Sequence, residues 1–256
     1  MRRYRACAWR PNIPGMQNLP SLFNRSARRW LLHTQAWLLP SRCLLCDAPG
    51  TGMLDMCRAC ETTLPWSLAA CPRCAMPVPA GDGGTPCGDC SRRRGILEST
   101  LATFVYQWPV DTLLRRFKFD GDLAAGRMLA QMMACRFAPA SVGNPVLVPV
   151  PLHDNRLRGR GYDQAAELAR PLASVLGLEC RAILRRRIAT AAQSSLDAVA
   201  RRRNVWGAFQ CVAPVPAHLV LVDDVMTTGA TLQSAAQALR QAGARQVGAW
   251  VCARAP

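Results

Sequence analysis

A long hydrophobic run is the first feature that this sequence lacks. Half of its 256 residues are hydrophobic, yet no stretch approaches the roughly 20 consecutive apolar residues that a membrane-spanning helix needs. The most apolar early stretch, Trp30 to Pro40, is interrupted by His33 and Gln35. The sequence therefore predicts no membrane insertion. Its length and hydrophobic content suit one substantial packed domain with a smaller module.

Acidic residues are missing from the N-terminus, where arginine is frequent and Asp47 is the first carboxylate. This stretch resembles a transit peptide superficially, but it has neither the uninterrupted apolar segment nor the small-residue cleavage site of a secretory signal. We interpret residues 1–40 as a variable N-terminal extension, with Met16 as a candidate start, and we expect a cytoplasmic protein. Thirteen cysteines, an odd number without an export signal, then argue against a disulfide framework.

Lysine is almost absent. Lys118 is the single lysine among 32 basic residues, so the formal net charge of +16 is carried by arginines spread along the chain. This basicity favours phosphate or nucleic acid ligands without choosing between them. One retained ammonium group among so many guanidinium groups indicates a compact, flexible charge placed at a phosphate or pyrophosphate. The arginine runs at 92–94 and 185–187 are expected to be solvated.

Eight cysteines form four Cys-x-x-Cys pairs. Two residues between thiolates let a tight turn aim both sulfurs at one metal ion, and two such pairs complete a tetrahedral zinc site. Ten residues separate the first two pairs and twelve the last two, which is enough for a short hairpin each. The predicted zinc ligands are Cys43, Cys46, Cys57, Cys60, Cys71, Cys74, Cys87 and Cys90.

We predict that residues 41–92 form a double zinc ribbon with two structural zinc ions, although the spacing leaves an interleaved pairing of the cysteines open. Four protein thiolates per zinc leave no coordination position for a catalytic water. Redox-active dithiols and an iron–sulfur cluster are the alternatives. The regular repetition of the pairs, with no thioredoxin-like strand and helix around any of them, argues against dithiols.

From residue 98 onward, strand-like runs alternate with helical patterns. Apolar runs predict strands at 101–106, 145–152, 219–224 and 246–252, and helical spacing covers 110–119, 123–137, 163–176 and 230–242. Alternation of this kind predicts parallel strands joined by helical crossovers. The expected architecture is α/β, a parallel sheet flanked by helices over residues 98–256 and preceded by the small zinc-ribbon domain. Ligands of such sheets bind at the carboxyl ends of the strands.

The stretch LVLVDDVMTTGATL places two aspartates at the end of a predicted strand, and a threonine-rich turn leads from there into a helix near Ala230. Gly229 permits a close backbone approach, and exposed amides at the helix start make a nest for a phosphate. Two carboxylates would repel that phosphate unless they accept hydrogen bonds from sugar hydroxyls; a plain helix cap is the alternative. The predicted ligand-binding residues are Asp223, Asp224, Val225, Met226, Thr227, Thr228, Gly229, Ala230 and Thr231.

The same stretch resembles the signature of type I phosphoribosyltransferases. More narrowly, the chain from about Cys43 to its end resembles the ComF family of competence-associated proteins in five blocks in order. These are the cysteine pairs, FKFDGD, VPVPLHDNRLRGRGYDQA, QSSLDAVARRRNVWGAF and the aspartate loop. The resemblance implies a phosphoribosyltransferase-like fold that binds phosphoribosyl pyrophosphate together with Mg²⁺. The acidic pair would hold the ribose hydroxyls, and the following loop would hold the terminal phosphate.

The resemblance also assigns the loop after residue 149. Pro151 and Leu152 match a pyrophosphate-binding loop, and the glycine-hinged stretch after them looks like a mobile segment that closes over the ligand. Guanidinium groups suit phosphate oxygens, so Arg156 is a predicted ligand contact. The predicted catalytic residues are Asp223, Asp224, Lys118, Arg158 and Arg160. Asp163 stands where the family usually has asparagine.

Two classes of function remain open. One is an enzyme that transfers the phosphoribosyl group to an unknown acceptor; Thr227 stands where hypoxanthine transferases have an acidic residue, which argues against that base-assisted mechanism. The other is a non-catalytic adaptor or sensor in DNA uptake or DNA utilisation that contacts single-stranded DNA or a partner helicase. Trp66 is the only aromatic residue between Cys43 and Cys90, so the predicted ribbons lack a base-stacking platform.

Overall fold

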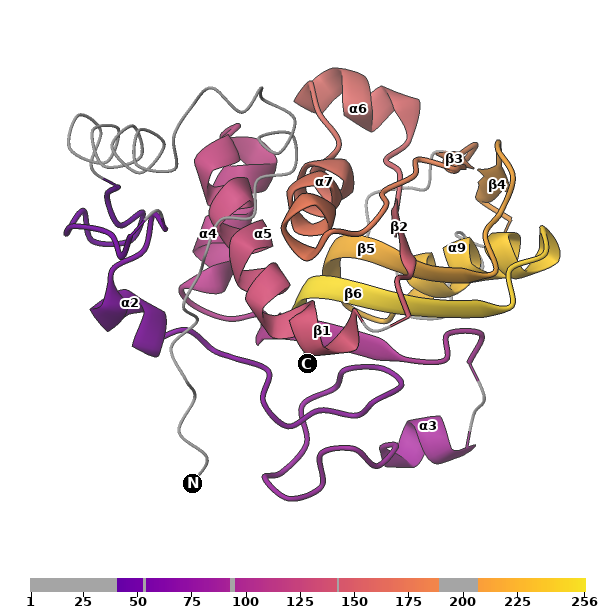
Figure 1. The fold of residues 1–256 in the computed structure, drawn as a ribbon, viewed down its shortest axis with the longest axis horizontal. Coiled ribbons are helices and arrows are strands. Elements are labelled where there is room, and N and C mark those ends of the chain that lie inside the picture. The colour runs from indigo at the N-terminus through magenta and orange to yellow at the C-terminus, as the bar shows by residue number, and fades with distance from the viewer. Residues whose placement is uncertain (1–40, 53, 93–94, 142, 189–206) are drawn as a thin grey trace, which may run out of the picture. The chain divides into compact units, whose positions relative to one another are not determined.

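The computed structural model describes residues 41–52, 54–92, 95–141, 143–188 and 207–256 (Figure 1). The extension 1–40 and most of the block QSSLDAVARRRNVWGAF lie outside the described residues. By its internal contacts the chain forms two compact units, Met1–Leu64 and Pro65–Pro256. Each unit holds one group of four cysteines. The domain limits 41–92 and 98–256 stay a prediction from the sequence.

The described part of the first unit is a pair of tight turns and one short helix, α2 (Arg58–Thr62). Asp47 adopts a positive φ of 60°, and the Asp47 amide donates to the Cys43 carbonyl at 2.8 Å. Helix α2 begins after Cys57, whose sulfur accepts a hydrogen bond from the Cys60 amide. With few buried side chains in these residues, the turns depend on the cysteines that they carry.

The second unit is built on a parallel sheet with the strand order β1-β6-β5-β2. Its central strand β5 contains the run Leu219–Val222, which is buried throughout, as strands covered on both faces require. The strands are β1 (Thr100–Val105), β2 (Val146–Pro149), β5 (His218–Met226) and β6 (Gln246–Arg254). The predicted parallel α/β sheet is therefore confirmed.

Helices cover both faces of this sheet. Leu221 and Val251 belong to one core cluster with Leu232 of α9 (Ala230–Gln241), whereas Trp250, the neighbour of Val251 in sequence, stacks its ring 5.0 Å from that of Phe137. The helices that pack with Phe137 on this second side are α5 (Leu123–Phe137) and α7 (Gln164–Leu176), with α4 (Val110–Phe119) against α5. No helix in the described ranges is long and apolar enough to cross a membrane.

Smaller elements surround the sheet. Helix α3 (Gly88–Arg92) lies in the second ribbon, η1 (Ala138–Ala140) follows α5, α6 (Asp154–Arg160) precedes α7, and β3 (Leu184–Arg186) pairs antiparallel with β4 (Phe209–Cys211). The sequence patterns did not predict α6 or the β3–β4 pair. They also ended the strand of the aspartates too early, because β5 continues to Met226, which pairs with Arg254 of β6.

Candidate functional site

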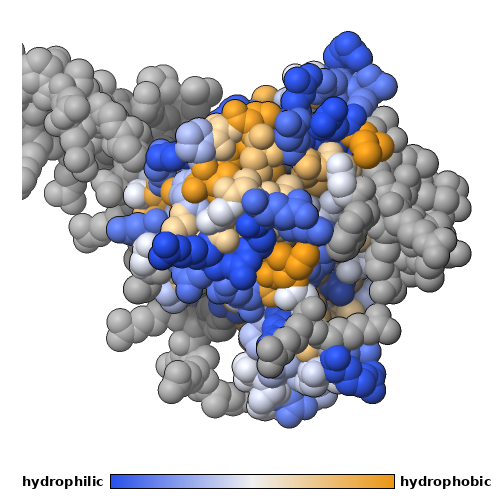
Figure 2. All heavy atoms as spheres, turned by 90° about the vertical axis from the view of Figure 1, so that its right-hand side faces the viewer, coloured by the Kyte–Doolittle hydropathy of each residue, from blue (hydrophilic) through white to orange (hydrophobic). Residues whose placement is uncertain are grey.

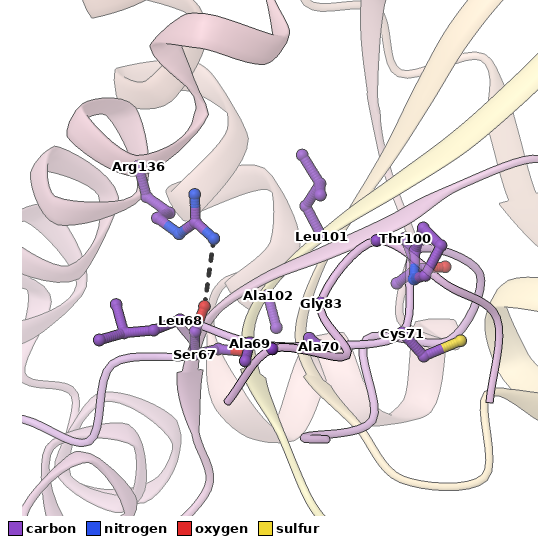
Figure 3. A pocket seen from close by; sticks show the side chains of 13 residues that line it. Ser67, Leu68, Ala69, Ala70, Cys71, Gly83, Thr100, Leu101, Ala102 and Arg136 are labelled. Carbon is purple, nitrogen blue, oxygen red and sulfur yellow. Dashed lines mark hydrogen bonds between the residues drawn. The ribbon is translucent and has the colours of Figure 1, made fainter. Parts of the chain in front are cut away.

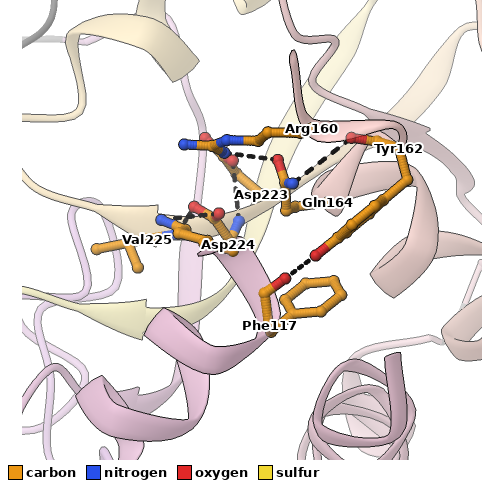
Figure 4. Close-up of polar contacts among 8 residues, drawn as sticks. Phe117, Arg160, Tyr162, Gln164, Asp223, Asp224 and Val225 are labelled. Carbon is orange, nitrogen blue, oxygen red and sulfur yellow. Dashed lines mark hydrogen bonds and ion pairs between the residues drawn. The ribbon is translucent and has the colours of Figure 1, made fainter. Parts of the chain in front are cut away.

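The two adjacent aspartates lie near the carboxyl end of β5, where they occupy different surroundings. Successive side chains of a strand point to opposite faces. Asp223 lines a shallow hollow together with the residues that follow it, whereas Asp224 is 9% exposed and pairs with Lys118. The Asp224 amide donates to Asp223 Oδ1 at 2.9 Å (Figure 4). Only Asp223 therefore faces the hollow directly.

The hollow lies at the start of α9, under the residues Thr227–Thr231, which we call the threonine loop. Gly229 has a φ of 76° and stands at the N-cap of α9 without a side-chain hydrogen bond. Thr227 and Thr228 are exposed, and Thr228 Oγ1 accepts a hydrogen bond from the Ala230 amide at 3.4 Å. This combination of a helix N-terminus, hydroxyl groups and a glycine turn can receive a phosphoryl group.

The hollow is small. Its volume is about 20 Å³, close to what a single water needs. The exposed residues Thr227 and Thr228 line it, so the hollow is a surface depression rather than an enclosed site.

The carboxyl group of Asp223 sits in a setting that favours its protonated form. Burial, followed by the negative charge of Asp224, raises the pKa of Asp223 to about 8. The Asp224 amide and the Lys118 ammonium lower this pKa, and the charge of Asp163 raises it. A protonated carboxyl group donates one hydrogen bond and still accepts others, which suits a ligand with several hydroxyl groups.

Lys118 forms an ion pair with Asp224 and is largely shielded from solvent. Its Nζ lies 2.8 Å from Asp224 Oδ2, and the two side chains are 20% and 13% exposed. Burial lowers the pKa of Lys118, but the charges of Asp224 and Asp223 and the hydrogen bond to Asp224 outweigh it, so that the pKa is raised. The structure thus brings together three predicted site residues, and the contact of Lys118 with a phosphate stays a prediction.

The loop between β2 and α6 approaches the same end of the sheet. The Val150 amide donates to the Val222 carbonyl at 3.0 Å, and the Leu152 amide donates to Asp163 Oδ2 at 2.8 Å. The other oxygen of Asp163 accepts the Ala166 amide at 3.0 Å and so caps α7. Because both carboxylate oxygens accept backbone N–H groups, Asp163 fixes the loop that contains the predicted contacts Pro151 and Leu152.

The predicted arginines lie on α6, a regular short helix. Arg158 is exposed and donates to Asn155 at 2.6 Å, and Arg160 donates to Gln164 at 2.8 Å. Arg156 is half-buried. In Figure 2 hydrophilic side chains gather at the top of the molecule, where Figure 1 places α6. The helix ends at Gly161, with a φ of 81°, and closure of this segment over a ligand stays a prediction.

Two residues near the site were not among the predicted ones. Arg186 belongs to a run that was expected to be solvated, but it is 6% exposed and its guanidinium lies 5.4 Å from the Phe209 ring. Burial and the charge of Arg156 lower the pKa of Arg186, and the charge of Asp223 raises it. The expectation holds for the exposed Arg185 and Arg187 and was wrong for Arg186, because β3 pairs with β4 and turns alternate side chains inward.

Tyr162 is the second such residue. Its hydroxyl donates to the Phe117 carbonyl (Figure 4), and the two rings lie 5.7 Å apart. Phe117 precedes Lys118 on α4, so Tyr162 ties the turn between α6 and α7 to the helix that carries the lysine. A lone tyrosine that follows a glycine turn gives no periodic signal, and the sequence patterns therefore missed it.

The cysteines form two four-membered clusters. The first cysteine cluster is Cys43, Cys46, Cys57 and Cys60, and the second is Cys71, Cys74, Cys87 and Cys90; within each, all sulfurs lie within 4.8 Å of one another. The predicted pairing of neighbouring Cys-x-x-Cys motifs is thus confirmed. Sulfur separations of 3.5 to 3.7 Å match the edge of about 3.8 Å in a tetrahedron with zinc–sulfur bonds of about 2.3 Å.

Backbone amides prepare both clusters for a cation. The Cys60 amide donates to the Cys57 sulfur at 3.4 Å and the Cys87 amide to the Cys71 sulfur at 3.3 Å. Burial raises the pKa of Cys71, but the amides of Cys87, Arg73 and Cys74 outweigh it and lower that pKa to about 6. Four thiolates in this geometry fit structural zinc and leave no open coordination position.

The second cysteine cluster is joined to the sheet within its own unit. The Thr100 amide donates to the Pro72 carbonyl at 2.8 Å, and Thr100 Oγ1 donates to the Arg73 carbonyl at 2.8 Å. A cavity of about 440 Å³ lies between the ribbon and β1 (Figure 3), and Arg136 of α5 donates there to the Ser67 carbonyl at 3.1 Å. The edge strand of the sheet thus carries the second ribbon.

The family comparisons agree with these two parts of the chain. Residues 34–91 match the double zinc ribbon domain, and residues 216–256 match the phosphoribosyl transferase domain. The second match begins just before β5 and includes the aspartates, the threonine loop, α9 and β6. The first match includes all eight clustered cysteines, which supports zinc as their structural metal.

Relatives match most of the chain. DNA utilization protein YhgH of Salmonella typhi is 34% identical over 225 residues, which cover 84% of this chain and 98% of that protein. The protein of the same name in Escherichia coli K12 is 32% identical with the same coverage. Competence protein F of Haemophilus influenzae is 31% identical over 179 residues, 66% of this chain and 78% of that protein.

Among solved structures, the glutamine phosphoribosylpyrophosphate amidotransferase of B. subtilis, complexed with ADP and GMP, aligns with 49% of this chain and 24% of its own. The identity is 22% and the TM-score 0.32, an overlap on which no argument rests.

Proposed function

Since the chain belongs to the family of the competence protein F and YhgH DNA utilization proteins, we propose that it binds phosphoribosyl pyrophosphate and acts in DNA uptake or DNA utilisation as a phosphoribosyltransferase-like protein. The names of the relatives support the cellular role. The match of residues 216–256 to the phosphoribosyl transferase domain supports the ligand. The protein acts in the cytoplasm, where phosphoribosyl pyrophosphate and DNA are both present.

The threonine loop is the observation that carries this proposal. It joins β5, which carries two aspartates near its carboxyl end, to the N-terminus of α9, where the N-cap Gly229 has no side chain to cap the helix. Amides and hydroxyls at such a terminus bind the 5-phosphate, while Asp223 accepts or donates hydrogen bonds with the ribose hydroxyls.

The remaining predicted residues contact the pyrophosphate end of the ligand. Pro151 and Leu152 form the loop that faces the pyrophosphate, and α6 brings Arg156, Arg158 and Arg160 over it. Lys118 neutralises Asp224 until the ligand enters and then shares its charge with the phosphate oxygens. Mg²⁺ bound together with the ligand would neutralise charge on the pyrophosphate leaving group.

In the catalytic form of this proposal, the bond between the anomeric carbon and the pyrophosphate oxygen breaks, and a nucleophilic atom of the acceptor bonds to that carbon. Positive charge develops on the sugar in between, and the Asp223 carboxyl group stabilises it in its ionised form. The chain holds both reactants in place and supplies no nucleophile. The acceptor provides that atom.

Calorimetry with phosphoribosyl pyrophosphate and Mg²⁺ tests the proposal. We expect the unchanged chain to bind, Asp223→Ala to weaken binding at least tenfold, and Asp82→Ala, a matched change at an exposed position of the second ribbon, to leave the affinity unchanged. A chain that binds no phosphoribosyl pyrophosphate, or an Asp223→Ala variant that binds as tightly as the unchanged chain, contradicts it.

A non-catalytic adaptor is the second candidate, and the net charge of +16 favours it. In this alternative the sugar-phosphate site regulates, and arginines contact single-stranded DNA or a partner helicase. Titration of an oligothymidylate at increasing salt separates the two: strong, salt-dependent binding that survives Asp223→Ala supports the adaptor. Release of pyrophosphate with an acceptor base, lost in the same variant, supports the enzyme.

A further inference from the structure

Arg254 is a buried cation at the end of β6, close to both the second cysteine cluster and the threonine loop. It is 5% exposed. A guanidinium group removed from water is tolerated only when its N–H groups find acceptors and its charge finds compensation. Buried Arg254 therefore needs hydrogen-bond acceptors for its N–H groups and negative charge nearby.

Three backbone carbonyls accept its hydrogen bonds. Nε donates to the carbonyl of Cys74 at 2.9 Å, and Nη1 donates to the carbonyl of Met226 at 3.2 Å and to that of Ala255. Cys74 is a member of the second cysteine cluster, and Met226 is the last residue of β5. One side chain thus connects a Cys-x-x-Cys turn of the second cysteine cluster to the residue that immediately precedes the threonine loop.

Met226 fixes the start of that loop in two ways. Its carbonyl accepts the Ala255 amide at 2.9 Å in addition to Arg254. Its side chain fills the space beside Gly229, where an added Cβ would lie 2.5 Å from Met226 Cε. A shift of Met226 therefore moves the turn on which the proposed phosphate site depends.

The charge of the zinc-loaded cluster is opposite in sign to that of the arginine. Four thiolates and one Zn²⁺ carry a net charge of 2 − 4 = −2, and Arg254 supplies a buried positive charge beside them. Ala75, the residue after Cys74, is fully buried in the same core cluster as Met226 and Leu232 of α9. The turn at Cys74, the end of β5 and the start of α9 therefore share one packed core.

We propose that Arg254 is a positioning residue that couples zinc occupancy of the second cysteine cluster to the conformation of the threonine loop. Loss of zinc releases the Cys74 turn and its carbonyl, Arg254 loses an acceptor and its compensating charge, and Met226 loses the support of Arg254. The first cysteine cluster has no part in this coupling. The consequence for ligand affinity rests on the proposed function, whereas the coupling itself does not.

Hydrogen–deuterium exchange of the full chain tests the coupling without a ligand. Cys90→Ser removes one zinc per chain and should speed exchange of two amides that hold the loop, Gln233, which donates to the Gly229 carbonyl, and Ala255, which donates to the Met226 carbonyl, at least tenfold. Arg254→Met should speed the same amides while the chain retains about two zinc ions. Cys60→Ser, the matched change in the first cysteine cluster, also removes one zinc but should leave exchange of both amides as in the unchanged chain.

Affinity for phosphoribosyl pyrophosphate gives a second readout. Arg254→Met should weaken binding at least tenfold, Arg254→Lys should restore part of it, and Arg240→Met, a change at an exposed arginine of α9, should have no effect. In the double variant Arg254→Met with Cys90→Ser, the two losses should not add, because both act through one link. Absence of binding by the unchanged chain overturns the proposed function and leaves the exchange experiment to decide the coupling.

The coupling is overturned if exchange of the Gln233 and Ala255 amides is the same in Cys90→Ser and in the unchanged chain, or if Cys60→Ser speeds it equally. If Arg254→Met does not fold, two other chains give the same comparison. One is Arg254→Lys. The other is Cys60→Ser, in which a chelator can remove only the zinc of the second cysteine cluster. Unchanged exchange in both of these also overturns it.

Discussion

At the scale of single residues, Asp223 links the candidate site to the stability of the protein. Its pKa is raised to about 8 from an ordinary value near 3.8, by burial first and by Asp224 second. Lys118 and Asp163 lie close enough to modify it, and Arg186 responds to its charge. Between these two pKa values the folded chain binds more protons at this carboxyl group than the unfolded chain, so the free energy of unfolding falls as the pH rises.

Asp223→Asn should therefore stabilise the ligand-free protein as the pH increases. The variant and the unchanged chain should melt at similar temperatures at pH 4. By pH 8 the melting temperature of the variant should exceed that of the unchanged chain by on the order of 5 °C, and the difference should not grow further at higher pH. Thermal melts across this pH range measure the difference. Equal melting temperatures at every pH would mean that the carboxyl group ionises freely in the folded chain.

Lys118 and Asp224 should behave as one unit. Lys118→Met leaves a buried carboxylate without its partner and should lower the free energy of unfolding by about 3 kcal/mol. Adding Asp224→Asn should recover most of this loss, because no unpaired charge remains. Arg170→Met, which breaks the exposed pair with Glu167, is the matched control and should cost less than about 1 kcal/mol; urea denaturation measures all four chains.

At the scale of elements, the sequence patterns were most informative where an element is long and periodic. The helices 110–119 and 123–137 were predicted with the bounds that the structure has, because apolar residues recur on one face of the first and make up most of the second. Helix α6 was missed because arginine, glycine and asparagine occupy most of its seven residues. It is specified instead by the His153 cap and the turn at Gly161.

The candidate site shows the same division. The acidic pair and the threonine loop could be predicted, because a run of apolar residues followed by carboxylates and a glycine turn has a local signature. The ion pair between Lys118 and Asp224 could not, since it joins residues more than a hundred positions apart. Arg186 was misjudged for a related reason: a strand of three residues is too short to display alternation in sequence.

Gly229→Ala tests the threonine loop as an element. Its φ of 76° disfavours a side chain, and the new Cβ would press on Met226 Cε, so ligand affinity should fall at least tenfold. Gly177→Ala is the control: it has a similar φ of 68° and nothing within 4 Å of the added Cβ. Both changes should destabilise the chain by about 1 kcal/mol, but only the first should weaken phosphoribosyl pyrophosphate binding in calorimetry.

At the scale of the whole molecule, the two cysteine clusters belong to different compact units and should lose zinc independently. The described residues of the first unit bury only Cys43, Met56, Cys57 and Leu64, so local opening there should require little free energy. The second cluster is anchored to β1 and shares the main core. A chelator should therefore remove zinc in two phases of equal amplitude, the faster one from the first cluster.

A zinc-binding dye that reports the released metal can follow both phases. Cys60→Ser should eliminate the fast phase and leave the slow one, because the second cluster draws its stability from the sheet rather than from the first ribbon. Cys90→Ser should do the reverse. Release in a single phase, or a slow phase that accelerates in Cys60→Ser, would mean that the two ribbons open as one cooperative unit, and the division of the chain at Leu64 would then have no thermodynamic counterpart.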